Sequence, residues 1–485
     1  MISTPFAFPG ARGAAALAIA ATLTLTGGIP LDAQSRRGAA TTPLSRTIRH
    51  FESIRHAPPE LIAFLRAMPK GADLHSHLSG AVYAERYVEW AAAQGLCVTV
   101  ATRSISPAPC DAPAEVAASD ALRNGVLYRQ LIDAWSMRAW QQSGQTGHDW
   151  FFDAFAKFGA ATGGNTGAML ADVVARAAHG NVSYVELMLT PDAGFSSRLG
   201  REAGWDGDLA GTFERLQKAG IAGAREPAVT VLREAEAVKD RLLKCGTPTA
   251  DPGCAVVIRY IAQVGRLGDP GQVFAQIITG LALASDPSTG VVGVNMVQPE
   301  DGLASMKNFG LHMQMFKFAR ARFPNAKVTL HAGELAPGLV PPDGLRSHVR
   351  ESVVTAGAER IGHGVSVMHE DDPYGLLREM ARRNVLVEIC LSSNDVILGV
   401  RGADHPLRTY IKYGVPVTLA TDDEGVARSD ISREYFKAVR EHGLGYRDIK
   451  RLARASVEHA FAAPADKARL LTSLDAAFAA FERRY

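Results

Sequence analysis

Eight short apolar runs rich in β-branched residues are spaced along the chain, and helix-like segments separate nearly all of them. Strands that are buried on both faces give continuous apolar runs, and helices between such strands make parallel pairing necessary. Eight units of this kind predict an α/β protein with a (β/α)8 TIM-type barrel. The runs cover residues 70–78, 182–189, 256–264, 291–297, 328–331, 360–365, 385–391 and 415–421.

Helical periodicity marks the segments between these runs, and it also marks a longer stretch after the first strand. Residues 114–167 read as helical, and we place an N-terminal helical insertion at about 97–167. An aromatic stripe around Phe155 in this insertion is expected to be core, with an apolar flap over a planar ligand as the alternative. The other expected helices are 58–68, 81–95, 168–179, 271–284, 304–323, 373–383 and 405–413.

The first 57 residues do not read as part of the barrel, which we place at 58–485. Arg12 precedes a short apolar run of small residues, and Ala33 offers a cleavage point. This pattern predicts a signal peptide at 1–33, a linker at 34–57, and export to the periplasm or the medium, without stable membrane insertion after cleavage. An uncleaved membrane tether is the alternative.

The five cysteines fit export. Cys97 and Cys110 lie close together in loop-like sequence, as do Cys245 and Cys254, while Cys390 sits alone in an apolar run. We therefore expect two local disulfides and one buried thiol. No Cys-x-x-Cys motif is present, so the sequence offers neither a zinc ribbon nor the cysteine-ligated zinc site of the cytidine-deaminase type.

Polar residues end several of the apolar runs, where a barrel places its active site. His75 and His77 project from one face of the first strand, because alternate residues of a strand share a face. His331, His363 and Asp422 lie at three later strand ends. Imidazole and carboxylate groups converging on one point are ligands for Zn²⁺ or a similar ion. The pattern predicts a metal-dependent hydrolase.

Five segments of the chain resemble the adenosine deaminase family of metal-dependent aminohydrolases. They are MPKGADLHSHLSGA, HAGE, RIGHG, the strand-seven segment ending SSN, and TDDE, in the family's order over about residues 60–440. The lead-in MPKG and the export signal are similar to the secreted, growth-factor-related branch, and exported bacterial homologues would look alike. The resemblance implies that His75, His77, His331 and Asp422 hold one Zn²⁺, which would lower the pKa of a bound water to about 7.

The same resemblance implies roles for three further residues. His363 would orient the attacking water and assist its deprotonation. A protonated Glu334 would donate to purine N1, and Asp423 would accept or share a proton with N7. The plainer alternatives are a packing role for His363, a helix-start carboxylate for Glu334 and an N-cap for Asp423.

Two substrate-binding positions depart from the family pattern. Gln298 stands where a glycine usually offers its N–H to purine N3, and we expect its side chain to crowd the pocket. Ser79 stands where many members carry an aspartate that meets the sugar. Ser393 and Asn394 are expected to be structural or supporting. His312, His348, His369 and His405 are read as ordinary helix or loop histidines.

The expected activity is hydrolytic deamination of adenosine, and also of 2′-deoxyadenosine, to inosine and ammonia, by a hydrolase acting on C–N bonds of cyclic amidines. Adenine or another 6-aminopurine derivative is the alternative substrate. The resemblance implies a small-molecule purine nucleoside as partner. A net charge of +2 without a long Lys/Arg run argues against nucleic acid as a partner. Oligomeric state is left open.

Two other function classes are alternatives. A different amidohydrolase-type metallohydrolase would often carry a metal-bridging lysine in strand four, and residues 291–298 contain no lysine. A secreted binding protein on a degenerate barrel would be favoured by a missing ligand, and all four expected ligands are present.

Overall fold

The eight apolar runs form the eight parallel strands of a barrel in the computed structural model, which describes residues 42–485. Neighbouring strands pair in chain order, and an isolated parallel bridge between Ser76 and Asp422 joins the last strand to the first. The predicted (β/α)8 barrel is confirmed. Its strands are β1 (Gly71–His77), β5 (Val182–Leu189), β6 (Val257–Gly265), β7 (Val291–Val297), β8 (Lys327–Ala332), β9 (Arg360–His363), β10 (Leu386–Ile389) and β11 (Val417–Leu419).

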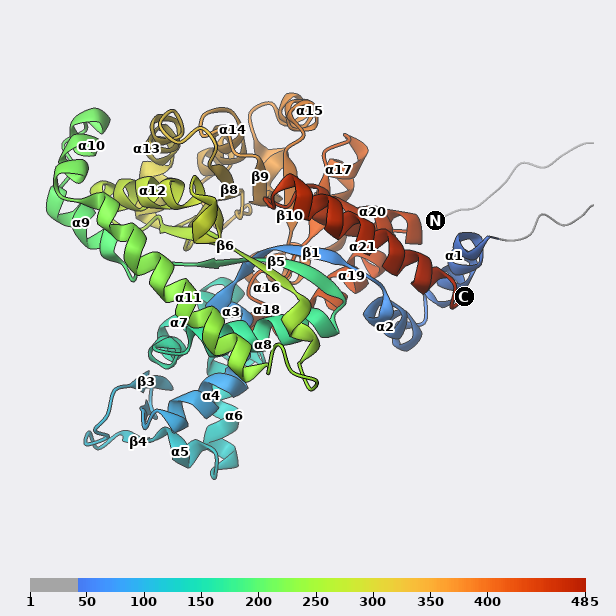
Figure 1. Cartoon of the computed structure of the whole chain (residues 1–485), viewed down its shortest axis with the longest axis horizontal. Coiled ribbons are helices and arrows are strands. Elements are labelled where there is room, and N and C mark those ends of the chain that lie inside the picture. The colour runs from blue at the N-terminus through green and yellow to red at the C-terminus, as the bar shows by residue number, and fades with distance from the viewer. Residues whose placement is uncertain (1–41) are drawn as a thin grey trace, which may run out of the picture. The chain divides into compact units, whose positions relative to one another are not determined.

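Helices surround this barrel, as the ribbon in Figure 1 shows. The helix α12 illustrates why they form: Asp269 and Gln272 make a capping box, Pro270 occupies the first turn, and eleven of its fifteen residues are buried. The helices that follow the second strand are α9 (Phe195–Ala203), α10 (Leu209–Lys218), α11 (Arg225–Leu242), α12 (Pro270–Ala284), α13 (Leu303–Arg320), α14 (His348–Val354), α15 (Pro373–Arg383), α16 (Leu391–Leu398), α17 (Leu407–Lys412), α18 (Glu424–Ala427), α19 (Ile431–Arg440), α20 (Tyr446–Glu458) and α21 (Pro464–Glu482).

The segment between β1 and β5 contains strands that the sequence did not predict. β2 (Cys97–Thr99) pairs antiparallel with both β3 (Ser104–Ser106) and β4 (Glu115–Ala117). Three-residue strands are too short to show a readable alternation, which is why residues 97–110 read as a loop and residues 114–167 as helical. Figure 1 shows β3, β4, α5 and α6 gathered in one lobe beside the barrel. The helices of this segment are α3 (Leu78–Ala81), α4 (Ala84–Ala93), α5 (Ala118–Ala121), α6 (Gly125–Ala134), α7 (Gly147–Phe158) and α8 (Thr166–His179).

The described structure includes a helix before the expected barrel boundary at residue 58. Helix α1 (Pro43–Ile54) lies within the stretch expected to be linker, and α2 (Pro58–Ala67) follows it. Phe51 of α1 is fully buried and packs on Phe64 of α2 with ring centroids 5.6 Å apart. Amphipathic packing against α2 and α21 therefore makes part of that stretch an integral element (Figure 1). The expected signal peptide lies outside the described residues.

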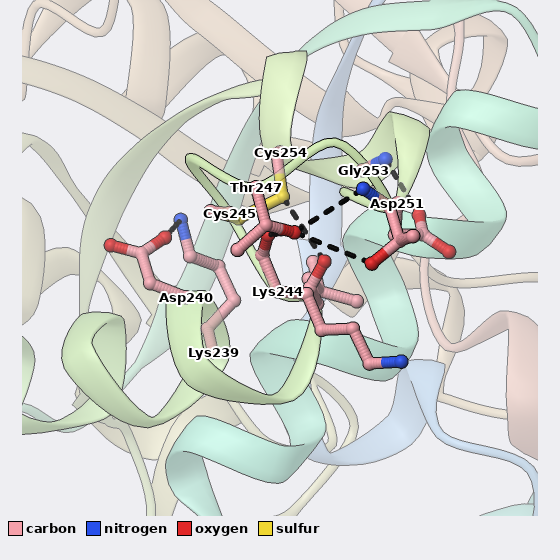
Figure 2. The surroundings of a disulfide bond; sticks show 10 residues. Lys239, Asp240, Lys244, Cys245, Thr247, Asp251, Gly253 and Cys254 are labelled. Carbon is pink, nitrogen blue, oxygen red and sulfur yellow. Dashed lines mark hydrogen bonds and ion pairs between the residues drawn. A yellow bond between two sulfur atoms is a disulfide. The ribbon is translucent and has the colours of Figure 1, made fainter.

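The cysteine prediction is confirmed. Cys97 is bonded to Cys110 and Cys245 to Cys254, and Cys390 is a buried free thiol. Figure 2 shows the second bridge closing the loop between α11 and β6. Within that loop the N–H of Gly253 donates to Asp251 Oδ1 at 2.7 Å. Among residues 42–485, no helix combines the length and apolar character needed to cross a bilayer.

Candidate active site

Four side chains from three strand ends converge at the carboxyl end of the barrel. His75 Nε2 and His77 Nε2 each lie 3.1 Å from His331 Nε2. Asp422 Oδ1 lies 3.5 Å from His75 Nε2 and 3.4 Å from His77 Nε2. The structure thus brings together all four residues expected to hold a metal.

The spacing of these atoms fits a tetrahedral ion. Ligands about 2.0–2.2 Å from a central zinc would stand roughly 3.3–3.6 Å from one another, close to the separations observed. Asp422 Oδ1 is buried and has no hydrogen-bond partner among the described residues. A buried carboxylate oxygen without a partner is costly unless a cation occupies the position it faces. The donor set therefore fits a bound divalent metal ion.

Polar residues inside the strands orient these ligands. Glu388 Oε2 lies 2.7 Å from His75 Nδ1, and Asn295 Oδ1 lies 2.9 Å from His331 Nδ1. The Gln263 amide lies 2.9 Å from His77 Nδ1. Each imidazole is thereby held through Nδ1, which leaves Nε2 toward the common point. Sequence reasoning missed these three residues, although a polar residue within an otherwise apolar strand was the available signal.

The hydroxyl of Ser393 orients the carboxylate ligand, Asp422, in the same way. Ser393 donates to Asp422 Oδ2 at 2.6 Å, which leaves Oδ1 facing the histidines. The expected supporting role of Ser393 thus has a specific contact.

Two further carboxyl groups, those of Glu334 and Asp423, face the same cavity. Burial, reinforced by the nearby charge of Asp422, raises the pKa of both carboxyls well above the usual range. This environment favours the protonated form of each side chain, the form that donates a hydrogen bond. In contrast, burial opposes the charge of Asp422, but the histidines that face its carboxylate, His75 above all, hold its pKa well below the usual range.

The loop that carries Glu334 is fixed by a second buried carboxylate, Glu300. Its two oxygens accept the N–H groups of Gly333 at 3.0 Å and Glu334 at 2.8 Å. His348 Nδ1 lies 2.6 Å from the same side chain. His348, expected to be an ordinary helix histidine, is instead part of the support of this loop.

His363 lies against the ligand histidines, with ring centroids 4.9 Å from His75 and 5.0 Å from His331. Its ring is fully buried, and Nε2 has no hydrogen-bond partner among the described residues. Burial lowers the pKa of His363 to about 3, so the ring is neutral at physiological pH. The expected position of His363 beside the metal ligands is thus observed.

Three residues of the site adopt left-handed backbone conformations that L-residues rarely occupy. The φ values are +79° for Gln298, +68° for His363 and +57° for Asp422, each at or just after the end of a strand. Such conformations persist only where the surrounding structure requires them, and they cluster at functional sites. Their concentration at one rim of the barrel supports a functional role for that rim.

A cavity of about 360 Å³ opens beside the four convergent side chains. One wall is aromatic, formed by Phe151, Phe152 and Phe155 of α7. Phe158 of the same helix instead stacks on Tyr87, with centroids 4.6 Å apart. The aromatic stripe is therefore core on one side and cavity wall on the other. Helix α7 packs against α16, which contributes Ile397 to the lining.

Gln298 and Ser79 also line this cavity. Gln298 adopts a backbone conformation that favours glycine, and its Oε1 accepts the N–H of Leu267 at 3.1 Å. The side chain is thus tied to the loop after β6, which limits the crowding expected from it. Ser79 presents a short side chain, and its carbonyl accepts the hydroxyl of Tyr87 at 2.6 Å.

Fold and site together define a (β/α)8 barrel protein with a buried histidine and aspartate cluster at the carboxyl end of its strands. The family model described as adenosine deaminase matches residues 167–477. The chain belongs to the adenosine deaminase family.

Individual relatives match the chain over a shorter stretch than the family model does. The chain is 36% identical to the adenosine deaminase of Salmonella typhi over 161 residues, which are 33% of this chain and 45% of that protein. The chain thus spans less than half the length of this curated relative.

Two solved structures share the fold across most of the chain. The adenine deaminase of Arthrobacter aurescens has a TM-score of 0.55 at 19% identity and covers 84% of this chain and 98% of its own. The N6-mAMP deaminase of arabidopsis has a TM-score of 0.56 at 20% identity, and the match covers 85% of this chain and 99% of that one.

Proposed function

We propose that this protein is a zinc-dependent deaminase that hydrolyses adenosine, and 2′-deoxyadenosine, to inosine and ammonia. The observation that carries this proposal is the combination of one four-donor cluster with two buried carboxyls of raised pKa, Glu334 and Asp423, in a single cavity. His75, His77, His331 and Asp422 would hold the ion. Bound there, Zn²⁺ would supply an activated water by lowering its pKa to about 7.

The chain's own residues would bind and polarise the purine. The Glu334 carboxyl would donate its proton toward ring N1, and the Asp423 carboxyl would hydrogen-bond N7. Both interactions draw electron density from the ring as the attacking water adds at C6, which is general acid assistance worth about 10²–10⁴ in rate. The aromatic wall around Phe155 would pack on the planar base and keep bulk water out.

The lining favours a nucleoside over a nucleotide. Among the described residues that line the cavity, none is lysine or arginine, while Glu334, Asp422 and Asp423 are acidic residues. A 5′-phosphate would find no cationic partner there. Because the named neighbours include an adenine deaminase and an N6-mAMP deaminase, adenine and 6-aminopurine nucleotides are the competing substrates.

The direct test is the ultraviolet change as adenosine becomes inosine, with purified zinc-loaded protein. A panel of adenosine, 2′-deoxyadenosine, adenine and AMP would separate the candidates, and a chelator-treated sample would test the metal. We expect the highest kcat/KM for adenosine and loss of turnover on chelation that zinc restores. Turnover of adenine or AMP alone would contradict the nucleoside assignment, and no turnover of any member would contradict the function.

We also propose that the protein is exported, with cleavage near Ala33. The two disulfides support this, because such bridges persist in oxidising compartments. Cell fractionation with N-terminal sequencing of the mature protein tests it: we expect a shortened chain outside the cytoplasm, and an intact chain in the cytoplasm would contradict export.

A further inference from the structure

Asn394 lies between two buried histidines, His363 of the candidate active site and His405 before α17. Asn394 Nδ2 is 3.1 Å from His363 Nδ1, and Asn394 Oδ1 is 3.1 Å from His405 Nε2. All three side chains are buried. We call His363, Asn394 and His405 the row. Because an amide can flip and a neutral imidazole has two tautomers, hydrogen-bond donation along the row could go in either direction. Its direction decides which nitrogen of His363 carries the proton.

The backbone fixes that direction. The N–H of Leu407 donates to His405 Nδ1 at 3.2 Å, and a peptide N–H can only donate. Burial, with smaller contributions from His442 and His363, lowers the pKa of His405 to about 3, so this ring is neutral. A neutral imidazole that accepts at Nδ1 carries its proton on Nε2. The opposite direction would require His405 to accept at both nitrogens, which a neutral ring cannot do.

The protonation of His405 Nε2 determines the donors and acceptors at Asn394 and then at His363. His405 Nε2–H donates to Asn394 Oδ1, so the amide nitrogen of Asn394 faces His363 and donates to Nδ1. His363 Nδ1 is therefore an acceptor, and the ring proton sits on Nε2. Glu334 Oε1 is 3.7 Å from His363 Nδ1, too far to compete as a hydrogen-bond partner.

We propose that His405 and Asn394 are positioning residues that hold His363 as the Nε2–H tautomer, so that its unpartnered Nε2 is a hydrogen-bond donor beside the ligand histidines. In this form His363 can orient the attacking water through its oxygen, but Nε2 has no lone pair to take that water's proton. This revises the expectation that His363 assists deprotonation, and it gives His405 a role that the sequence did not indicate. The catalytic consequence rests on the proposed function, whereas the tautomer does not.

The tautomer can be read by ¹⁵N NMR of the zinc-loaded full chain with labelled histidine. Loss of signals in His363→Asn assigns the ring. We expect a protonated Nε2 and an unprotonated Nδ1 in the wild type. Asn394→Asp should reverse this pattern, because a carboxylate still accepts from His405 but offers no donor to His363 Nδ1. A wild-type His363 protonated on Nδ1 would overturn the proposal, as would an Asp variant with an unchanged pattern.

The second test measures the kinetics of variants at His405. His405→Phe removes the donor and should lower kcat by about 10–100-fold with little change in KM, zinc content or Tm. His405→Gln keeps an N–H for Asn394 and should recover most of that loss. His442→Phe is the matched control, since it replaces a neighbouring buried imidazole, whose ring centroid lies 5.7 Å from that of His405, without removing a hydrogen bond of the row.

Each kinetic outcome bears on the claim. Wild-type kcat in His405→Phe, or loss of zinc in Asn394→Asp with the tautomer unchanged, would show that the row has only a structural role. If the wild type deaminates no substrate, the proposed function fails, while the NMR experiment still decides the tautomer.

Discussion

Gly362 lies directly beneath the ring of His75: a Cβ atom on Gly362 would stand 2.5 Å from His75 Cε1 and 2.9 Å from Nδ1. Strand β9 can approach this ring so closely only because it carries no side chain there.

Gly362→Ala should therefore displace His75 from the metal cluster. We expect at least about a tenfold loss of zinc affinity, since a ligand must move for the methyl group to fit. Competition with a fluorescent zinc chelator measures this. Gly310→Ala on α13 is the control, because a Cβ there meets nothing within 4 Å. Unchanged affinity in Gly362→Ala would mean that His75 does not hold the ion.

Glu334→Gln should abolish most turnover while zinc content stays that of the wild type. The amide cannot transfer a proton to N1, so kcat should fall by about 10²–10⁴. Elemental analysis beside steady-state kinetics checks both points. Because Glu334 lies outside the four-donor cluster, loss of metal in this variant would contradict its assigned role.

Phe155→Ala should raise KM for the nucleoside more than it lowers Tm. The side chain lines the cavity, so its removal takes away a surface that packs on the base. Phe158→Ala is the matched control on the same helix, because Phe158 stacks on Tyr87 and should affect Tm without changing KM. Equal effects of the two variants on KM would assign the whole stripe to the core.

Glu434→Gln should change how stability depends on pH. Burial raises the pKa of Glu434 to about 7, from an ordinary value of 4.5. Between these values the folded state binds more protons than the unfolded state, so stability from this group is full below pH 4.5 and is lost as pH rises through about 7. The wild type should lose a few degrees of Tm from pH 5 to pH 8 that the variant does not lose. Parallel profiles for the two proteins would contradict this prediction.

The strands and the convergent ligands were predictable from the sequence because each depends on local pattern. Buried parallel strands are apolar runs, and a polar residue such as His331 at the end of one is conspicuous. The support of the site was not predictable in the same way. Glu388 meets His75 across 313 residues of sequence, and only the closed barrel brings them together.

Other differences have equally physical causes. The strands β2 to β4 are too short to leave a pattern, and α1 depends on packing against elements at both ends of the barrel domain. His405 looked ordinary because its significance lies in a backbone N–H two residues later, which carries no sequence signal.

The bridge between Ser76 and Asp422 marks the seam where the barrel's first and last strands meet. Because His75 and His77 come from one side of that seam and Asp422 from the other, a bound ion would cross-link the first and last strands. Removal of the ion should weaken the pairing of the first and last strands first. The rate of amide hydrogen exchange would then rise in β1 and β11 before it rises in the other strands.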